Sequence, residues 1–113
     1  MKNKKEVISY ITENFENTSF GISDVCFRFN ISDKTVTSIV KENTGQTFRD
    51  FIKNLRTTKA KKLLSTTKLK MSDIAQMCGY GTEGAFYKAF KKDFDISPGT
   101  YRKGALSKEE YSA

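Results

Sequence analysis

The sequence contains no histidine, no tryptophan and a single proline, and only two of its 113 residues are cysteine. Without histidine, a four-ligand zinc site would need several carboxylates, so we expect no metal and no other cofactor. Cys26 and Cys78 fall within apolar patterns, which favours buried, reduced thiols over a disulfide framework. No segment approaches the roughly 20 apolar residues of a membrane helix, and the N-terminus lacks the apolar core of a signal peptide. We therefore expect a cytoplasmic protein.

The residues that are present suffice for one globular domain, or for two very small lobes that share a core. Hydrophobic residues make up 37% of the chain, with 9 Phe and 5 Tyr, so aromatic bulk is available for a core. Apolar and polar residues do not alternate for long enough to indicate a sheet. The patterns predict an all-α fold of about seven helices.

The net charge of +7 is concentrated in one part of the chain. Residues 47–70 contain eight basic residues and one acid, whereas the remainder is balanced. A local basic stripe is typical of an element that follows the phosphates of a nucleic acid. The alternative is a solvated helix face that binds nothing.

Helical spacing and capping residues place the expected elements. The patterns predict helices over residues 4–15, 22–29, 33–43, 47–65, 71–78 and 82–94, a short helix from Pro98, and a mobile tail over residues 104–113. Asn30 suits a left-handed turn, Ser32 and Ser97 suit N-caps, and Gly45 suits a helix end. Thr47 and Asp50 have the spacing of a capping box.

One segment repeats within the chain. SDVCFRFNI at residues 23–31 returns as SDIAQMCGY at residues 72–80, and the agreement of apolar and small positions continues after one inserted residue. The spacing of the small residue, the turn residue and the apolar set predicts two helix-turn-helix motifs, over residues 22–45 and 71–95. The alternative is a helical bundle whose core matches this spacing twice.

Spacing also predicts the core and the connection between the motifs. The expected core residues are Val25, Cys26, Ile39, Ile74, Ala75, Cys78, Phe86, Phe90, Phe94 and Ile96. The long helix at residues 47–65 has one apolar face in its first half and another, about 120° away, in its second half. We therefore expect it to join two lobes.

The second motif and the segment after it resemble a known family. The shared residues are Ile74-Ala75, Gly79-Tyr80, Phe86, Phe90-Lys91-Lys92, Ser97-Pro98 and Tyr101-Arg102, in that order. They are similar to the signature of the AraC/XylS-type transcriptional regulators. The chain departs from it at Cys26, where the family favours Ala, and at Asp95, where Gly is commoner. The resemblance implies a bilobed DNA-binding domain that binds double-stranded promoter DNA and contacts RNA polymerase.

Helix-turn-helix geometry assigns candidate contacts, because the early outward positions of the second helix meet base edges. The expected base-facing residues are Asp33, Lys34, Thr37, Ser38, Thr82, Glu83, Gly84, Tyr87 and Lys88. The expected contacts to the DNA backbone are Lys41, Arg49, Lys53, Arg56, Lys91 and Lys92. For Asp33 and Glu83 an alternative role is to stabilise the positive end of the helix dipole. Because the two sets differ at every position, we expect an asymmetric site that a monomer reads, with two sub-sites about 10 bp apart.

Other functions remain open from the sequence. Some relatives of this fold carry DNA-repair chemistry on a reactive cysteine, which would need an exposed or activated thiol at Cys26 or Cys78. A helical protein-interaction module without DNA affinity is another alternative. Stacking of single-stranded bases is disfavoured, because only Tyr87 among the motif aromatics points outward. The chain is expected to be either a minimal regulator or the C-terminal piece of a larger one, with any dimerisation through a further domain.

Overall fold

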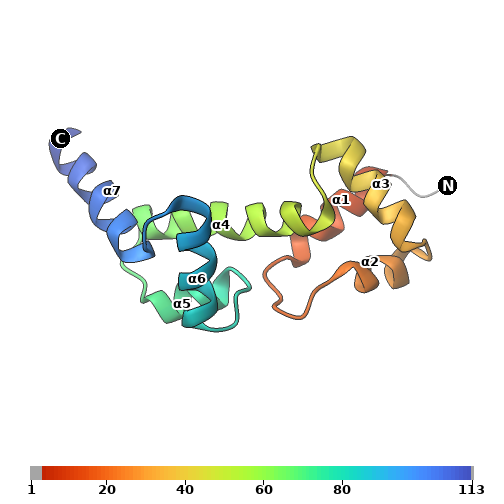
Figure 1. Cartoon of the computed structure of the whole chain (residues 1–113), viewed down its shortest axis with the longest axis horizontal. Helices are drawn as coiled ribbons and strands as arrows, with labels where there is room; N and C mark the ends of the chain where they lie inside the picture. Colours follow the sequence, from red (N-terminus) through yellow and green to blue (C-terminus); the bar gives the residue numbers. More distant parts are fainter. Residues whose placement is uncertain (1–3, 113) are drawn as a thin grey trace. The chain divides into compact units, whose positions relative to one another are not determined.

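The computed structural model describes the backbone of residues 4–112 and the side chains of residues 4–105. Within this backbone there are seven α-helices and no β-strand, which confirms the all-α prediction (Figure 1). The chain divides into two compact units, the first ending at Arg56 and the second beginning at Thr57. No helix of the described part of the chain is both long enough and apolar enough to cross a membrane.

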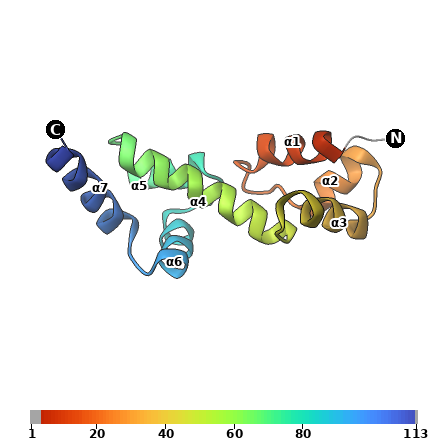
Figure 2. The same ribbon diagram turned by 90° about the horizontal axis from the view of Figure 1, so that it is seen from above.

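The first unit contains α1 (Lys4–Asn14), α2 (Ile22–Phe29), α3 (Asp33–Thr44) and the beginning of α4 (Phe48–Thr66). α1 packs against both α2 and α3 (Figure 2). The apolar residues at helical spacing on these helices, and two between them, form one core. They are Val7, Ile11, Phe15, Phe20, Val25, Phe29, Val36, Ile39, Val40 and Ile52.

The second unit contains the rest of α4, α5 (Met71–Met77), α6 (Glu83–Phe94) and α7 (Pro98–Ser112). Its core consists of Ala60, Leu64, Ile74, Ala75, Cys78, Phe86 and Phe90. Phe90 of α6 links this helix to α7, because its ring lies edge-on to Tyr101 of α7 at 5.6 Å as well as to Phe86 of α6 at 5.9 Å. Each helix-turn-helix pair therefore has a core of its own.

α4 is the linker helix that the two apolar faces predicted. Ile52 in its first half is buried in the first core, and Ala60 and Leu64 in its second half are buried in the other. The hydroxyl of Thr47 accepts a hydrogen bond from the amide of Asp50 at 3.1 Å, so Thr47 caps the helix as expected. The helix runs unbroken from Phe48 to Thr66.

The structure corrects two predictions at the end of the chain. Ile96 was expected in the core, but 38% of it is exposed, because α6 ends at Phe94 and Asp95 turns left-handed with φ of 59°. Helical spacing does not continue past that turn. The expected tail at residues 104–113 is helical as far as Ser112. Gly104 weakens helix formation there by about 1 kcal/mol, and the segment contains no proline. Residue 113 lies outside the described residues.

Candidate nucleic-acid interface

The first helix-turn-helix consists of α2, a short turn and α3. Asn30 ends α2 in the left-handed conformation, with φ of 53° and ψ of 51°, as its residue type predicted. Ser32 caps α3, and its hydroxyl accepts a hydrogen bond from the amide of Thr35 at 3.1 Å. The turn fixes the direction of α3 and the cap fixes its first residue, so together they determine which side chains face outward.

The outward face of α3 carries the residues that the motif geometry selected. Asp33, Lys34, Thr37 and Ser38 are all exposed. On the opposite face, Val36 and Val40 are fully buried in the core of the first unit. The structure therefore brings the four predicted residues together on one solvent-facing surface. Lys41, predicted to contact the DNA backbone, is exposed further along the same helix.

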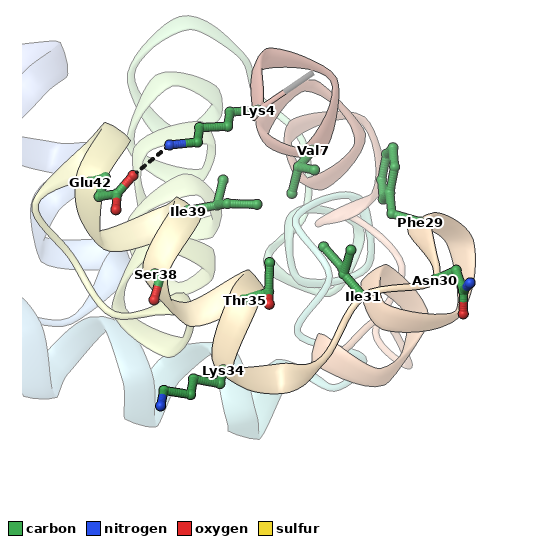
Figure 3. Close-up of a pocket in the computed structure, with 10 residues that line it drawn as sticks. All are labelled: Lys4, Val7, Phe29, Asn30, Ile31, Lys34, Thr35, Ser38, Ile39 and Glu42. Carbon is green, nitrogen blue, oxygen red and sulfur yellow. Dashed lines mark hydrogen bonds and ion pairs between the residues drawn. The ribbon is translucent and has the colours of Figure 1, made fainter. Parts of the chain in front are cut away.

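An open groove of about 590 Å³ lies beside α3 in the first unit, between α1 and the turn that precedes α3. Val7, Ile31 and Ile39 point into this groove, whereas Lys34 points away from it (Figure 3). At one end, Lys4 of α1 forms an ion pair with Glu42 of α3 at 2.9 Å (Figure 3). Both partners are well exposed, so this pair contributes little to stability. Lys34 lies at the edge of the groove, and its side chain extends outward from α3.

The second helix-turn-helix, α5 to α6, is built in the same way with different residues. The turn uses Gly79 and Gly81, with φ of 90° and 84°, where the first motif uses one asparagine. Thr82 caps α6, and its hydroxyl accepts from the amide of Ala85 at 3.1 Å. The predicted base-facing residues Thr82, Glu83, Gly84, Tyr87 and Lys88 are all exposed. Phe86 and Phe90 on the opposite face are fully buried.

Two residues of the outward face of α6 have informative surroundings. Tyr87 is 41% exposed, and its hydroxyl lies 3.8 Å from where a Cβ on Gly99 would be, so the ring reaches the first turn of α7. A Cβ on Gly84 would meet no atom within 4 Å. The absence of a side chain at Gly84 is therefore not required by the packing of this unit.

The predicted phosphate-contacting residues do not form one uniform group. Arg49, Lys91 and Lys92 are exposed, and Lys53 is half-buried. Arg56 differs from them, because its Nε donates to the carbonyl of Phe15 at 3.0 Å and its Nη2 to that of Asn17 at 3.3 Å. These carbonyls follow the end of α1, where no helical partner is available. Arg56 thus has a structural role in the first unit, and we remove it from the candidate interface.

The sequence reasoning missed the equivalent role of Arg102. Its Nε donates to the carbonyl of Leu64 at 3.0 Å, and its Nη1 donates to that of Leu69 at 2.8 Å. Arg102 of α7 therefore holds the C-terminal end of α4, as Arg56 of α4 holds the end of α1. In both cases an arginine binds carbonyls at or just beyond the C-terminal end of an earlier helix. The position of Arg102 in the family signature was the available signal, but spacing alone does not reveal its partners.

The cysteines differ from each other, contrary to the prediction that both are buried. Cys78 is fully buried, whereas Cys26 is half-buried and its Sγ donates a hydrogen bond to Oδ1 of Asp33 at 3.0 Å. Cys26 lies at the edge of the first core, where it meets the polar side chain of Asp33 on α3. The pKa of the Cys26 thiol is raised, first by this hydrogen bond, then by desolvation and by the negative charge of Asp33. Cys26 therefore ionises to the thiolate less readily than an ordinary cysteine.

Comparison with known proteins identifies this arrangement. Residues 25–104 match the protein family described as a helix-turn-helix domain. The raffinose operon transcriptional regulatory protein RafR of Pediococcus pentosaceus is 34% identical over 96 residues, covering 85% of this chain and 34% of that protein. The C-terminal domain of the two-component response regulator yesN from Fusobacterium nucleatum is 32% identical, with a TM-score of 0.81, covering 88% of this chain and 96% of that chain. The chain belongs to the AraC/XylS family.

A structure solved with DNA shares the fold of this AraC/XylS domain. The DNA-binding domain of AdpA in complex with a target DNA has a TM-score of 0.85 and 21% identity, and the match covers 96% of each chain. The curated relatives are longer proteins, and this chain spans about a third of their length or less. The family is one of transcriptional regulators, and its helix-turn-helix domain binds DNA.

Proposed function

We propose that this AraC/XylS domain recognises an asymmetric promoter sequence by placing α3 and α6 in the major groove. The observation that carries the proposal is the repeated presentation of one exposed helix face by two separately packed motifs. On α3 this face offers a lysine, two hydroxyls and a carboxylate, and on α6 it offers a lysine, a tyrosine and a carboxylate. These groups donate to guanine and accept from cytosine. Different chemistry on the two helices predicts two unlike sub-sites.

The proposed interface has a backbone-contacting part. Lys41 on α3, Lys91 and Lys92 on α6, and Arg49 and Lys53 on α4 carry the positive charge that neutralises phosphates. Such contacts position the domain without selecting a sequence. Of the basic residues later on α4, Lys61 has a different environment, since its Nζ lies over the ring of Phe94 at 4.6 Å.

The enzyme alternative lacks support from the thiols. A reactive cysteine requires exposure together with a lowered pKa. Cys78 is buried, and the pKa of Cys26 is raised by its bond to Asp33. We therefore infer that DNA binding, and not thiol chemistry, is the activity of this chain.

The chain is proposed to act as the C-terminal DNA-binding domain of a longer regulator. Two solved relatives of 30% identity or more are C-terminal domains of response regulators. Curated relatives include transcriptional activators named RhaS and RhaR. We infer activation through contact with RNA polymerase on promoter DNA in the cytoplasm, with the domain itself monomeric on DNA.

Selection of bound duplexes from a random pool tests the proposal and its residues. The wild-type domain should enrich one asymmetric motif. Lys34→Ala, Thr37→Ala and Lys88→Ala should each change the preferred bases at a few positions, by about 1–3 kcal/mol for a good contact. Because all three side chains are exposed, the melting temperature should not fall. Lys91→Ala is the contrasting variant, because it should weaken binding to all sequences equally. If Lys34→Ala, Thr37→Ala and Lys88→Ala also weaken binding to all sequences equally, these residues only position the domain and do not read bases.

Neutralising the basic residues of the first half of α4 should lower the salt dependence of binding. For Arg49→Gln with Lys53→Gln, the slope of log K against log salt should flatten by about 0.9 per lost phosphate contact. Lys62→Gln is the control, since Lys62 follows Lys53 by nine residues and lies on the opposite side of the same helix. Fluorescence titrations at several salt concentrations measure the slope. Equal slopes for the double variant and the wild type would exclude these residues from the interface.

Gly84→Ala should change stability and DNA affinity in opposite directions. A Cβ at Gly84 meets no protein atom, and alanine is the better helix former, so stability should rise by about 0.5 kcal/mol. If α6 lies close to bases, the added methyl should reduce DNA affinity by about tenfold. Gly104→Ala is the matched control, because it also has open space at Cβ and lies in α7. Unchanged affinity for Gly84→Ala would show that α6 does not approach DNA closely at this position.

A further inference from the structure

The hydrogen bond between Cys26 and Asp33 connects the two helices of the first motif. Cys26 is on α2, and Asp33 is the first residue of α3, immediately after the N-cap. The thiol donates to Oδ1 of the carboxylate at 3.0 Å. A carboxylate has two oxygens, so Oδ2 remains available as an acceptor on an exposed side chain. The contact therefore restricts the orientation of Asp33, a candidate base-reading residue, and leaves its Oδ2 able to accept another hydrogen bond.

We propose that Cys26 is a positioning residue for sequence recognition, which holds Asp33 so that its second oxygen accepts a hydrogen bond from the amino group of a cytosine. The proposal rests on the proposed function, in which α3 reads the major groove. Cys26 itself does not touch the base. It acts through Asp33, as outer partners orient the groups that contact a ligand at other sites.

The physical benefit of the contact is a smaller loss of freedom on binding. An exposed aspartate samples several side-chain conformations, and a base contact that selects one of them costs entropy. A hydrogen bond already formed in the free protein reduces that cost at binding. It also gives the carboxylate a partner other than the amides of the first turn of α3, one of which already donates to Ser32. The contact therefore favours base reading over the helix-capping role.

The second motif provides an internal comparison. In the repeat, Ala75 occupies the position of Cys26, and Glu83 occupies the position of Asp33. Ala75 is fully buried and has no donor, so packing at this position needs only a methyl group. Cys26 packs against the edge of the first core, and the second motif shows that this fold tolerates a methyl group at the same position, so Cys26→Ala should fold. The first residue of α3 therefore has a thiol donor from the preceding helix, whereas for the corresponding residue of α6, Glu83, the equivalent position of the preceding helix is an alanine without one.

Selection from a random duplex pool, repeated with variants, tests the proposal. Asp33→Asn and Cys26→Ala should lower the preference for the same base pair, by about threefold to tenfold. Cys26→Ser, which restores a donor, should recover it. The double variant Cys26→Ala with Asp33→Asn should lose no more than either single variant, because both break one interaction. Glu83→Gln is the control, expected to alter a different position and to combine additively with Cys26→Ala. Circular dichroism of each variant verifies folding.

The hydrogen bond has a readout that does not involve DNA. Asp33 raises the pKa of Cys26, so a smaller fraction of Cys26 than of an ordinary cysteine is ionised at a given pH. Asp33→Asn removes the charge, should lower that pKa toward its ordinary value, and should speed alkylation by iodoacetamide at pH 8 severalfold. Cys78 is buried and should not contribute. An unchanged alkylation rate would mean that the bond is not formed in solution, which overturns the proposal whatever the DNA result.

The outcomes with DNA separate the proposal from the proposed function. If Asp33→Asn shifts base preference and Cys26→Ala does not, Asp33 reads the base unaided and only the role of Cys26 is wrong. If neither shifts it while Lys34→Ala does, Asp33 is not a base contact and the proposal is wrong, although α3 still reads DNA. If the wild-type domain selects no sequence at all, the proposed function fails and the positioning role fails with it.

Discussion

Inserting about 5 bp between the two sub-sites should reduce the affinity of the domain to that of a single helix-turn-helix. Both recognition helices belong to one chain and are connected by α4, an unbroken helix of 19 residues. A helix of this length is about 28 Å long, close to the ~34 Å that separates major grooves on one face of the duplex. Half a turn of extra DNA moves the second groove to the far side. α4 would have to bend to carry the second motif there.

Gel-shift titrations with spacers of 0, 5 and 10 added bp measure this effect. The 5 bp insertion should lose all the binding energy of one motif, a loss of more than a hundredfold if each motif contributes about 3 kcal/mol in base contacts. The 10 bp insertion restores the face of the duplex but not the distance, so it should remain weak. If the 5 bp insertion proves harmless, either α4 bends or one motif alone engages DNA. Variants Lys34→Ala and Lys88→Ala would then show which motif that is.

Replacing Arg102 should destabilise the second unit more than any exposed substitution. Its guanidinium donates to the carbonyls of Leu64 and Leu69 at 3.0 and 2.8 Å, and in a variant without the guanidinium both carbonyls would lose a charged donor. Arg102 is half-buried, so water replaces only part of the interaction. We expect Arg102→Gln to cost about 2 kcal/mol and to lower the melting temperature by roughly 10 °C. Thermal unfolding followed by circular dichroism measures this change.

Two further variants determine whether geometry or charge is responsible. Lys103→Gln removes the same charge from the exposed neighbour of Arg102 and should leave the melting temperature unchanged. Arg102→Lys keeps the charge, but a lysine cannot reach two carbonyls with a planar fork, so it should recover only part of the loss. If Arg102→Lys is as stable as the wild type, the charge matters and the paired hydrogen bonds do not. Arg56→Gln should produce a comparable loss through the first unit, against Arg49→Gln as its control.

Local chemistry explains why so much of the fold was predictable from the sequence. Asn30 and Gly45 adopt the left-handed conformations that their residue types favour, and Ser32 and Thr47 accept the capping hydrogen bonds that their positions predicted. Such interactions join residues only two to four positions apart, so their signals are contiguous in the chain. The 3.6-residue period likewise placed the buried faces of the recognition helices, because burial on one side of a helix is a property of spacing.

The tertiary structure alone decided interactions between residues distant in sequence. Arg56 looked like a member of a basic stripe, and only the end of α1, 39 to 41 positions away, shows where its guanidinium binds. The polar partner of Cys26, which spacing had placed in the core, appears only when the turn brings Asp33 of the next helix to it. Periodicity records that a position faces the protein interior but not which atom it meets there. The sequence by itself therefore determined the two-motif architecture and the outward faces of α3 and α6, whereas three-dimensional packing decided which charged and polar groups bind other parts of the protein.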